Sequence, residues 1–166
     1  INRYFVSKGL EVIKLRKSKA LTAIFDNSKI KSQPKSEDLG YILGPQINAA
    51  SRMGYSSLPH KLLISDNISE IDTISRKLIL YNEKRKLIEN QIYNEAKDQI
   101  KSDKNSKFIL IYGENWHNGV LGIVASRILN EFNKPTIVIS FENNIGTGSA
   151  RSITAINLAK IIIDSK

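Results

Sequence analysis

Residues 108–141 read FILIYGENWHNGVLGIVASRILNEFNKPTIVISF, a strand–helix–strand pattern. The run 108–112 is continuous and apolar, and 136–141 is mostly apolar and rich in β-branched residues, which is typical of buried strands. Between them, residues 119–133 place apolar side chains on one side of a predicted helix, and Pro135 follows it. Two strands joined by one helix pair in parallel through a right-handed crossover. The stretch therefore predicts an α/β unit.

The segments on either side extend this pattern. Asn143-Asn144 indicates a turn, followed by a third strand at 147–153 and a last helix at 155–165. Upstream, apolar residues at steps of three and four predict an amphipathic helix at about 67–104. At 1.5 Å per residue this helix is about 50 Å long, which is typical of a connector between two lobes.

The first part of the chain is predicted to be helical. The expected segments are 2–15, 18–26, one that starts near 36, and a short helix or turn at 46–53. Asn2 is a candidate cap of the first segment. Gly44-Pro45 is expected to interrupt the third, and 54–59 to form a loop. The fold class is therefore α/β, with a helical part, a long connector helix and an α/β part.

Composition limits the function classes. The 166 residues are 41% hydrophobic, and 25 Lys and Arg against 16 Asp and Glu give a net charge of +9. A pI of 9.7 is typical of a nucleic-acid-binding domain. The chain is also rich in Ile, Asn and Lys, which an AT-rich genome produces without selection for binding, so charge leaves both explanations open.

Several kinds of chemistry are excluded or not supported. Without cysteine there is no disulfide, thiolate metal site or cysteine nucleophile, and a cytoplasmic location is favoured. No apolar run approaches the roughly 18 residues of a membrane span, so no membrane association is expected. Phosphate-loop, HExxH, GxSxG and Asp-x-Asp motifs are absent, and His60 and His117 lie far apart without an acidic cluster. We therefore expect no complete metal site.

A first candidate segment is LGPQINAASRMG, residues 43–54. Asn48 and Arg52 are four residues apart and share a face if the segment is helical. The three small residues between them let another molecule approach the backbone closely. The alternative is a tightly packed helix with two polar groups on its surface.

A second candidate segment is GENWHNGVLG, residues 113–122, which joins a strand to the start of a helix. A helix N-terminus suits a phosphate, and Asn118 is its candidate cap. Trp116 is a candidate for stacking on a base. The alternatives are that Trp116 fills the core and that His117 is an ordinary loop residue.

A third candidate segment is GTGSARS, residues 146–152. Arg151 offers a fork of donors that matches phosphate, and Ser149 and Ser152 add neutral donors. These groups predict a compact anion site. The alternative is a hairpin turn with a solvated arginine.

Together, in this order and spacing, these segments resemble the RecJ family of single-strand-specific exonucleases, within the DHH phosphoesterases. The resemblance covers essentially the whole chain. The stretches that carry it are NRYFV (2–6), LGPQINAASRMG (43–54), YGENWHNGVLGIVASRI (112–128) and GSARSI (148–153).

The resemblance implies a segment of a 5′→3′ exonuclease that acts on single-stranded DNA in recombination and repair. The family uses Mg²⁺ or Mn²⁺, held by aspartates and histidines of an amino-terminal DHH domain. Those motifs are not in this sequence, nor is the family's later Gly-Gly-His motif. The implied parts are the end of the DHH domain (1–65), a connector (66–107) and a truncated DHH-associated domain (108–166). We expect no catalytic or metal-binding residue here, and no activity of the segment alone.

The resemblance also implies roles for single residues. Ser149, Arg151 and Ser152 match the motif that lines the DNA end, where the family grips the terminal 5′ phosphate. Asn48 and Arg52 match the motif that faces the catalytic cleft.

In the remaining motif, His117 and Gly119 match the loop at the start of the associated domain's helix. Two positions depart from the family pattern: Gln46 stands where arginine is common, and Ser51 where glycine is common. The absence of a cation at position 46 counts against a DNA contact there.

Two alternatives remain open at this point. One is another DHH-family phosphoesterase that acts on short oligonucleotides or cyclic dinucleotides. The other is a non-catalytic nucleic-acid-binding module or a decayed fragment. The expected partner is single-stranded DNA, and the sequence does not identify protein partners.

Overall fold

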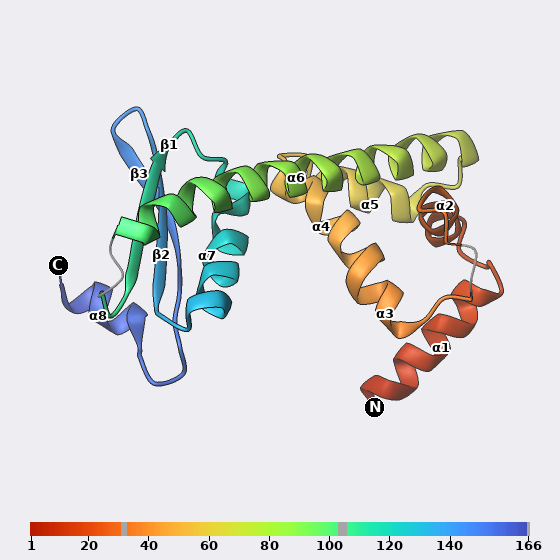
Figure 1. Ribbon diagram of the computed structural model, residues 1–166. Helices are drawn as coiled ribbons and strands as arrows, with labels where there is room; N and C mark the ends of the chain where they lie inside the picture. The colour runs from red at the N-terminus through yellow and green to blue at the C-terminus, as the bar shows by residue number, and fades with distance from the viewer. Residues whose placement is uncertain (31–32, 103–105, 166) are drawn as a thin grey trace. The chain divides into compact units, whose positions relative to one another are not determined.

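The computed structural model describes residues 1–30, 33–102 and 106–165 (Figure 1). The chain divides into two compact units, Ile1–Arg85 and Lys86–Lys166. The 35-residue helix α6 (Ile68–Ser102) begins in the first unit and ends in the second, as predicted for a long helix at about 67–104. No helix of the described residues is both long and apolar enough to cross a bilayer.

The first unit is helical, as predicted. Before α6 it contains α1 (Asn2–Lys14), α2 (Lys19–Asn27), α3 (Ser36–Asp38), the π-helix η1 (Leu39–Leu43), α4 (Gly44–Arg52) and α5 (Ser57–Ile64). Its core forms where apolar side chains of α2, α4 and α5 meet the first half of α6. The buried members of this cluster are Ala20, Ile24, Ala50, Leu62, Ile71, Ile74 and Leu78.

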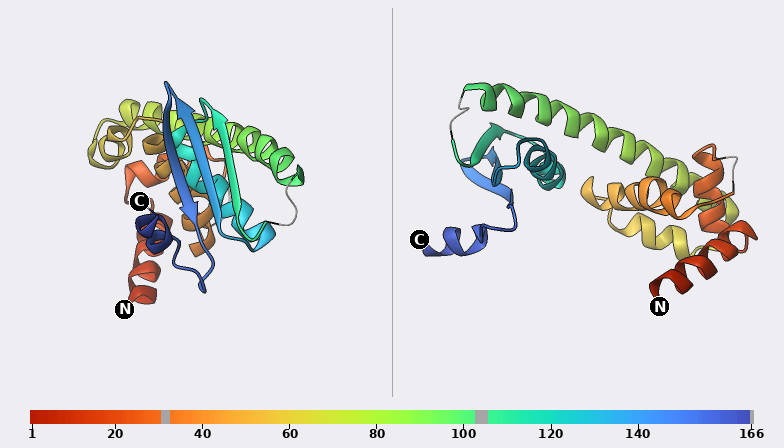
Figure 2. Two further views of the ribbon diagram at one scale, coloured as in Figure 1. Left: turned by 90° about the vertical axis from the view of Figure 1, so that its left-hand side faces the viewer. Right: turned by 60° about the horizontal axis from the view of Figure 1, so that its bottom comes forward.

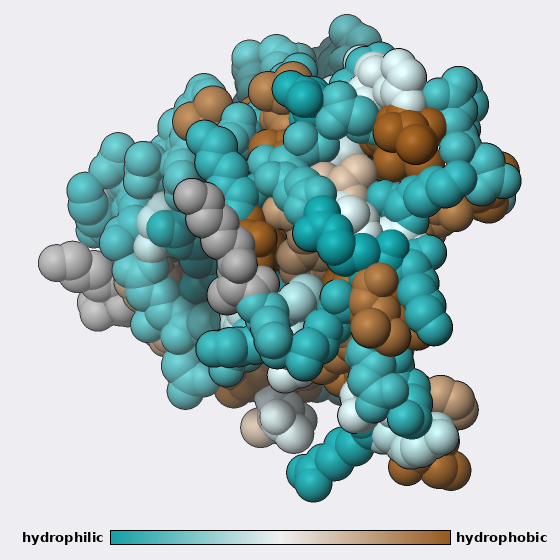
Figure 3. All heavy atoms as spheres, turned by 90° about the vertical axis from the view of Figure 1, so that its right-hand side faces the viewer, coloured by the Kyte–Doolittle hydropathy of each residue, from teal (hydrophilic) through white to brown (hydrophobic). Residues whose placement is uncertain are grey.

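Helix α1 buries little of its apolar surface. Only Ile13 is buried, whereas other large apolar residues of this segment are exposed, namely Ile1, Tyr4, Phe5, Val6, Val12 and Leu15. Hydrophobic patches are visible between hydrophilic side chains on the face of the molecule shown in Figure 3. The predicted cap of α1 is wrong: Ile1 is the N-cap residue, without a side-chain hydrogen bond, and Asn2 is already helical.

The predicted interruption at Gly44-Pro45 takes the form of a π turn rather than a break. The N–H of Gly44 donates to the carbonyl of Leu39, five residues earlier, and α4 follows directly. A Cβ at Gly44 would lie 3.1 Å from Leu39 O, so glycine suits this close approach. Pro45 lies in the first turn of α4, where a missing N–H costs little.

The loop predicted at 54–59 is too long, because α5 already begins at Ser57. Pro59 occupies the first turn of α5, where proline fits a helix. Gly54, with φ of +88°, makes the sharp turn that separates α4 from α5.

The second unit is an α/β unit, as predicted. After the end of α6 it contains β1 (Ile109–Glu114), α7 (Asn118–Phe132), β2 (Thr136–Glu142), β3 (Ile145–Arg151) and α8 (Leu158–Asp164). The three strands form one sheet in the order β1-β2-β3 (Figure 2). β1 and β2 pair in parallel, with Ile111 opposite Val138, and β2 and β3 pair antiparallel, with Val138 opposite Ser149.

Turn chemistry explains the hairpin between β2 and β3. Only Asn143 and Asn144 separate the two strands, and both have positive φ, of 51° and 62°. Positive φ at both positions is the signature of a type I′ turn, whose twist matches a hairpin. The predicted turn at Asn143-Asn144 is therefore confirmed, and β3 begins two residues earlier than predicted.

One face of the sheet packs against α7. Side chains of Ile111, Thr136 and Val138 are fully or almost fully buried. The residues of α7 that are buried share one side of the helix and are Val120, Leu121, Val124, Ala125 and Ile128. Alternation then sends Leu110, Tyr112 and Phe141 to the other face, where they are exposed.

The free edge of β1 is partly closed by a side chain from α6. The amide nitrogen of Gln99 donates to Tyr112 O at 2.6 Å, and Tyr112 N–H donates to Gln99 Oε1 at 3.2 Å. The amide group thus takes the position of a neighbouring strand for one residue. This pairing satisfies two backbone groups that an exposed strand edge otherwise leaves unpaired. It also links the end of α6 to the sheet.

A polar cluster joins α6 to α7 on the outside of the second unit. Lys97 Nζ contacts Glu131 Oε1 at 2.8 Å, and the Tyr93 hydroxyl donates to Glu131 Oε2. The guanidinium of Arg127 lies 3.7 Å from the centre of the Tyr93 ring. Hydrogen bonds from Lys97 and then Tyr93 lower the pKa of Glu131 below its ordinary value, and the contact with Glu131 raises the pKa of Lys97.

We expect the contribution of Glu131 to stability to depend on pH. A carboxyl group whose pKa is lowered by folding stabilises the folded state above its unfolded pKa of about 4.5, and this contribution is lost as the pH falls. Urea unfolding of the wild-type chain and of Glu131→Gln should therefore differ most near neutral pH. A difference that persists unchanged down to about pH 3 would contradict this assignment.

Candidate nucleic-acid interface

The predicted anion site is centred on Arg151, the last residue of β3. Its guanidinium is held by neutral groups of two elements. Nε donates to Ser126 Oγ of α7 at 3.1 Å. Nη1 donates to Ser149 Oγ at 3.3 Å and to the carbonyl of Ala150 at 2.8 Å. The structure thus brings Arg151 and Ser149 together.

Glycine at position 122 makes room for this arrangement. A Cβ at Gly122 would lie 2.9 Å from Arg151 Nη2 and 3.1 Å from Ser149 Oγ. Contacts this short require a neighbouring atom to move. Because Gly122 has no side chain, the guanidinium can lie close to the backbone of α7.

Among the described residues, no carboxylate neutralises the charge of Arg151. All its hydrogen-bond acceptors there are uncharged: two serine hydroxyls and one carbonyl. Its Nη2 makes no hydrogen bond to any residue that the structure describes, and the side chain is exposed. An exposed guanidinium with an available donor edge is suited to a phosphate oxygen.

Ser152 is placed differently from Ser149. Its hydroxyl donates to the carbonyl of Ile156 at 2.8 Å and stabilises the turn that follows β3. A serine hydroxyl has one proton, so in this conformation the side chain of Ser152 has no donor left for a phosphate. Its role at a DNA end therefore stays a prediction from the resemblance.

His117 and Gly119 contact each other at the start of α7. His117 is the N-cap residue, and its Nδ1 accepts a hydrogen bond from Gly119 N–H at 3.1 Å. The prediction that Asn118 caps this helix is therefore wrong, because Asn118 is the first helical residue. Since Gly119 N–H already has an acceptor, the helix N-terminus presents one amide fewer to a phosphate.

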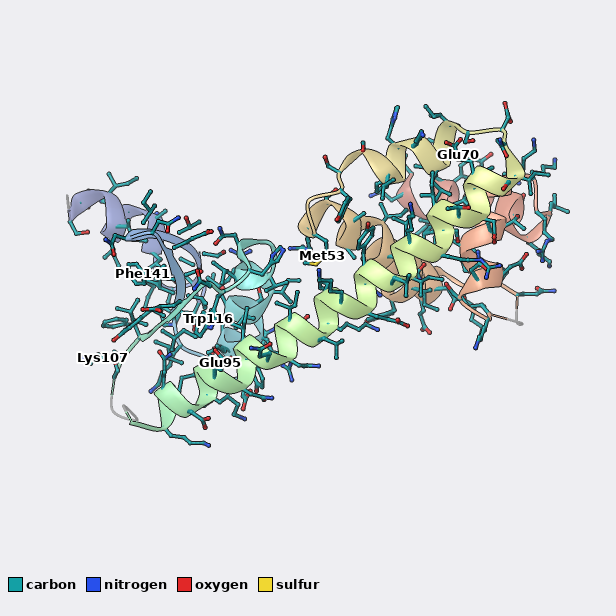
Figure 4. The ribbon with its side chains drawn as sticks, turned by 90° about the horizontal axis from the view of Figure 1, so that it is seen from above. Met53, Glu70, Glu95, Lys107, Trp116 and Phe141 are labelled. Atoms are coloured by element: carbon teal, nitrogen blue, oxygen red, sulfur yellow. The ribbon has the colours of Figure 1, made fainter. Side chains whose placement is uncertain are left out.

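Trp116 belongs to the core of the second unit. Only 7% of it is exposed, and its Nε1 donates to Glu95 Oε2 of α6 at 2.7 Å (Figure 4). A Cβ at Gly113 would lie 2.2 Å from the indole ring, so the ring packs directly on the strand backbone. Trp116 is therefore not available to stack on a base, and the core alternative is confirmed.

Asn48 and Arg52 lie on α4 in the first unit, and both are exposed. The two alanines that follow Asn48 are fully buried. These alanines, Ala49 and Ala50, serve the packing of the helix. The side chain of Gln46 is also buried, and its Nε2 donates to Ser28 Oγ at 2.8 Å. Gln46 therefore links α4 to Ser28, which caps the end of α2.

Metal-binding groups are not supplied by the described residues. Within 1–30, 33–102 and 106–165, no group of three or more histidine, aspartate or glutamate side chains is placed to hold a metal ion.

Two residues of the Arg151 cluster, Gly122 and Ser126, are not predicted as site residues from the sequence. Ser126 and Gly122 are four residues apart in a helix, so they share one face, but neither residue type indicates a site alone. Their contact with Arg151 requires β3 to be placed beside α7.

Comparison with known proteins defines the class. The DHHA1 domain family matches residues 89–165. The fold also resembles two crystal structures of RecJ. One is RecJ from Thermus thermophilus in complex with Mg²⁺, with a TM-score of 0.87 and 27% identity over 99% of this chain and 25% of that one. The other is an exonuclease RecJ bound to manganese, with a TM-score of 0.86 and 28% identity over 98% of this chain and 40% of that one.

Curated relatives identify the family. The single-stranded-DNA-specific exonuclease RecJ of Salmonella typhimurium is 34% identical over 95% of this chain. The proteins of that name from Escherichia coli and Bacillus subtilis are 33% and 29% identical. The chain therefore contains a DHHA1 domain and belongs to the RecJ family. It spans 29% of the length of the Salmonella and Escherichia relatives and 20% of the Bacillus relative.

We expect His117 to act as a helix cap. Replacing it with alanine should lower the free energy of unfolding by about 1 kcal/mol, whereas His117→Asn, which restores a capping side chain, should recover most of that loss. Chemical denaturation of the two variants measures the difference. Equal destabilisation by alanine and asparagine would contradict the capping role.

Proposed function

We propose that this chain is part of a 5′→3′ exonuclease that acts on single-stranded DNA in recombination and repair. Its contribution is to bind the DNA and its 5′ phosphate. The observation that carries the proposal is the exposed guanidinium of Arg151, which is held in place by uncharged groups and has no carboxylate partner among the described residues. The name of the curated relatives, single-stranded-DNA-specific exonuclease, supports the substrate.

The proposed phosphate site consists of Arg151 and Ser149 in the second unit. Asn48 and Arg52 are proposed as a further DNA contact on α4. For Ser152 and Gly119 the proposal rests on the family motif, because the Ser152 hydroxyl and the Gly119 N–H are engaged within the protein. For His117 it rests on the motif as well, and the Nδ1 atom of its ring accepts from Gly119 N–H. The net charge of +9 supports attraction to a polyanion.

The organisation that we propose follows the family. Residues 1–65 correspond to the end of a DHH domain, 66–107 to a connector and 108–166 to part of the DHH-associated domain. Related RecJ structures contain Mg²⁺ or Mn²⁺. The described residues of this chain do not fit such an ion, because they bring no set of ligands together. We therefore assign metal-dependent hydrolysis to residues that this chain does not contain, and a cytoplasmic location remains part of the proposal.

Arg151→Ala should weaken binding most for strands with a 5′ phosphate. Losing a hydrogen bond to a charged group costs about 1.5–3 kcal/mol, or roughly tenfold to over a hundredfold in affinity. Fluorescence anisotropy with one oligonucleotide, carrying a 5′ phosphate or a 5′ hydroxyl, measures this across a salt series. Affinity should fall with salt, with a slope of about −0.7 for each phosphate contacted.

Arg76→Ala is the matched control, because it makes the same change of charge at an exposed arginine that is paired with Asp72. It should leave the phosphate preference intact. Equal weakening of 5′-phosphate and 5′-hydroxyl strands by Arg151→Ala would contradict the end-binding role. Binding of short oligonucleotides or cyclic dinucleotides in preference to long strands would favour another DHH-type phosphoesterase instead.

The purified chain alone should not digest single-stranded DNA in the presence of Mg²⁺ or Mn²⁺. The reason is the lack of a ligand cluster within the described residues. Release of nucleotides from a labelled strand measures this, with a chelator as control. Digestion that persists through purification and stops on chelation would show that the chain holds a metal site after all.

A further inference from the structure

The orientation of Arg151 depends on a serine of the neighbouring helix. Ser126 Oγ accepts a hydrogen bond from Arg151 Nε at 3.1 Å and donates its own proton to the carbonyl of Gly122 at 2.9 Å. Because the single hydroxyl proton is directed to that carbonyl, the oxygen lone pairs face the guanidinium. Ser126 is therefore an acceptor of fixed direction, anchored one helical turn back.

Gly122 acts on the same guanidinium through space rather than through a hydrogen bond. Its missing side chain leaves the volume in which Arg151 Nη2 lies, since a Cβ there would approach Nη2 to 2.9 Å. Nothing else about Gly122 requires glycine, because it lies inside α7 and its φ is not in the left-handed region. In a helix interior glycine is less favourable than alanine. The advantage of glycine that the structure shows at position 122 is the space for Arg151 Nη2.

These contacts leave one part of the guanidinium available. Nε is bonded to Ser126 and Nη1 to Ser149 and Ala150, whereas Nη2 makes no hydrogen bond within the described residues. A long arginine side chain loses much rotamer freedom when it binds a ligand. If the protein already holds the guanidinium, this cost is met before the ligand arrives, and affinity increases.

We propose that Ser126 and Gly122 are positioning residues for the 5′-phosphate site. Ser126 orients the guanidinium of Arg151 through Nε, and Gly122 provides the space beside α7 that lets Nη2 face a terminal phosphate. This inference rests on the proposed function of Arg151. It adds two residues of α7 to the cluster that Arg151 forms with Ser149 on β3.

Ser126→Ala tests the hydrogen bond. Affinity for the 5′-phosphorylated oligonucleotide, relative to the same strand with a 5′ hydroxyl, should fall about threefold to tenfold, as expected for one net hydrogen bond. Binding of the 5′-hydroxyl strand and the melting temperature should stay unchanged. Ser126→Thr, which keeps the hydroxyl, should restore the preference. Asn130→Ala, at an exposed position on the same helix, is the control and should change neither quantity.

Gly122→Ala tests the space. Alanine favours a helix over glycine, and the group that it meets is the mobile end of Arg151, so the melting temperature should be equal or higher. The phosphate preference should nevertheless fall, because Cβ displaces the guanidinium. A gain in stability with a loss of preference would separate positioning from a general structural role. An unchanged preference in Gly122→Ala would overturn this part of the proposal.

A double-mutant cycle distinguishes failure of the inference from failure of the proposed function. In an Arg151→Ala background, Ser126→Ala should have no further effect on the phosphate preference. If Arg151→Ala itself leaves the preference unchanged, the proposed function fails. If Arg151→Ala abolishes the preference but Ser126→Ala retains it, only the positioning role is overturned.

Discussion

Burial of the apolar side of α7 against one face of the sheet is the constraint on which the second unit depends. Val120, Val124 and Ile128 of the helix and Val138 of the sheet are all without exposed surface. A strand–helix–strand crossover is stable only if the helix covers the sheet in this way. Once α7 lies there, the residues of β3 that share this face, Ser149 and Arg151 among them, meet the helix as well.

This arrangement explains why a polar cluster forms at the margin of an apolar interface. Arg151 is opposite Thr136 at the end of the β2–β3 ladder, so its long side chain reaches past the buried residues toward solvent. Gly122 and Ser126 occupy the part of α7 that this side chain crosses. Larger apolar residues there would exclude the guanidinium. Helix α7 therefore packs against the sheet with its apolar residues and contacts the guanidinium of Arg151 through Gly122 and Ser126.

Many elements could be predicted from local pattern. The β-branched runs around Ile111 and Val138 and the periodicity of α6 identified strands and a long helix, because hydrophobic period is set by backbone geometry. The errors lie where local rules permit several outcomes. Pro59 suggested a loop but occupies the first turn of α5, and Asn118 suggested a cap although His117 provides it. A proline or a polar residue near a helix start fits either side of the boundary.

The sequence was sufficient for the fold class, the family and the motif that contains Ser149 and Arg151, because these depend on residues that are adjacent or regularly spaced. The tertiary structure alone decided which conspicuous residues are available. Trp116 is taken by Glu95 and the core, and Gly119 by His117, whereas Arg151 keeps a donor without an acceptor among the described residues. It also decided that Ser126, 25 residues earlier in the chain, contacts Arg151. Such hydrogen bonds and close contacts involve residues that are distant in the sequence. They exist only once α7 and β3 are packed together.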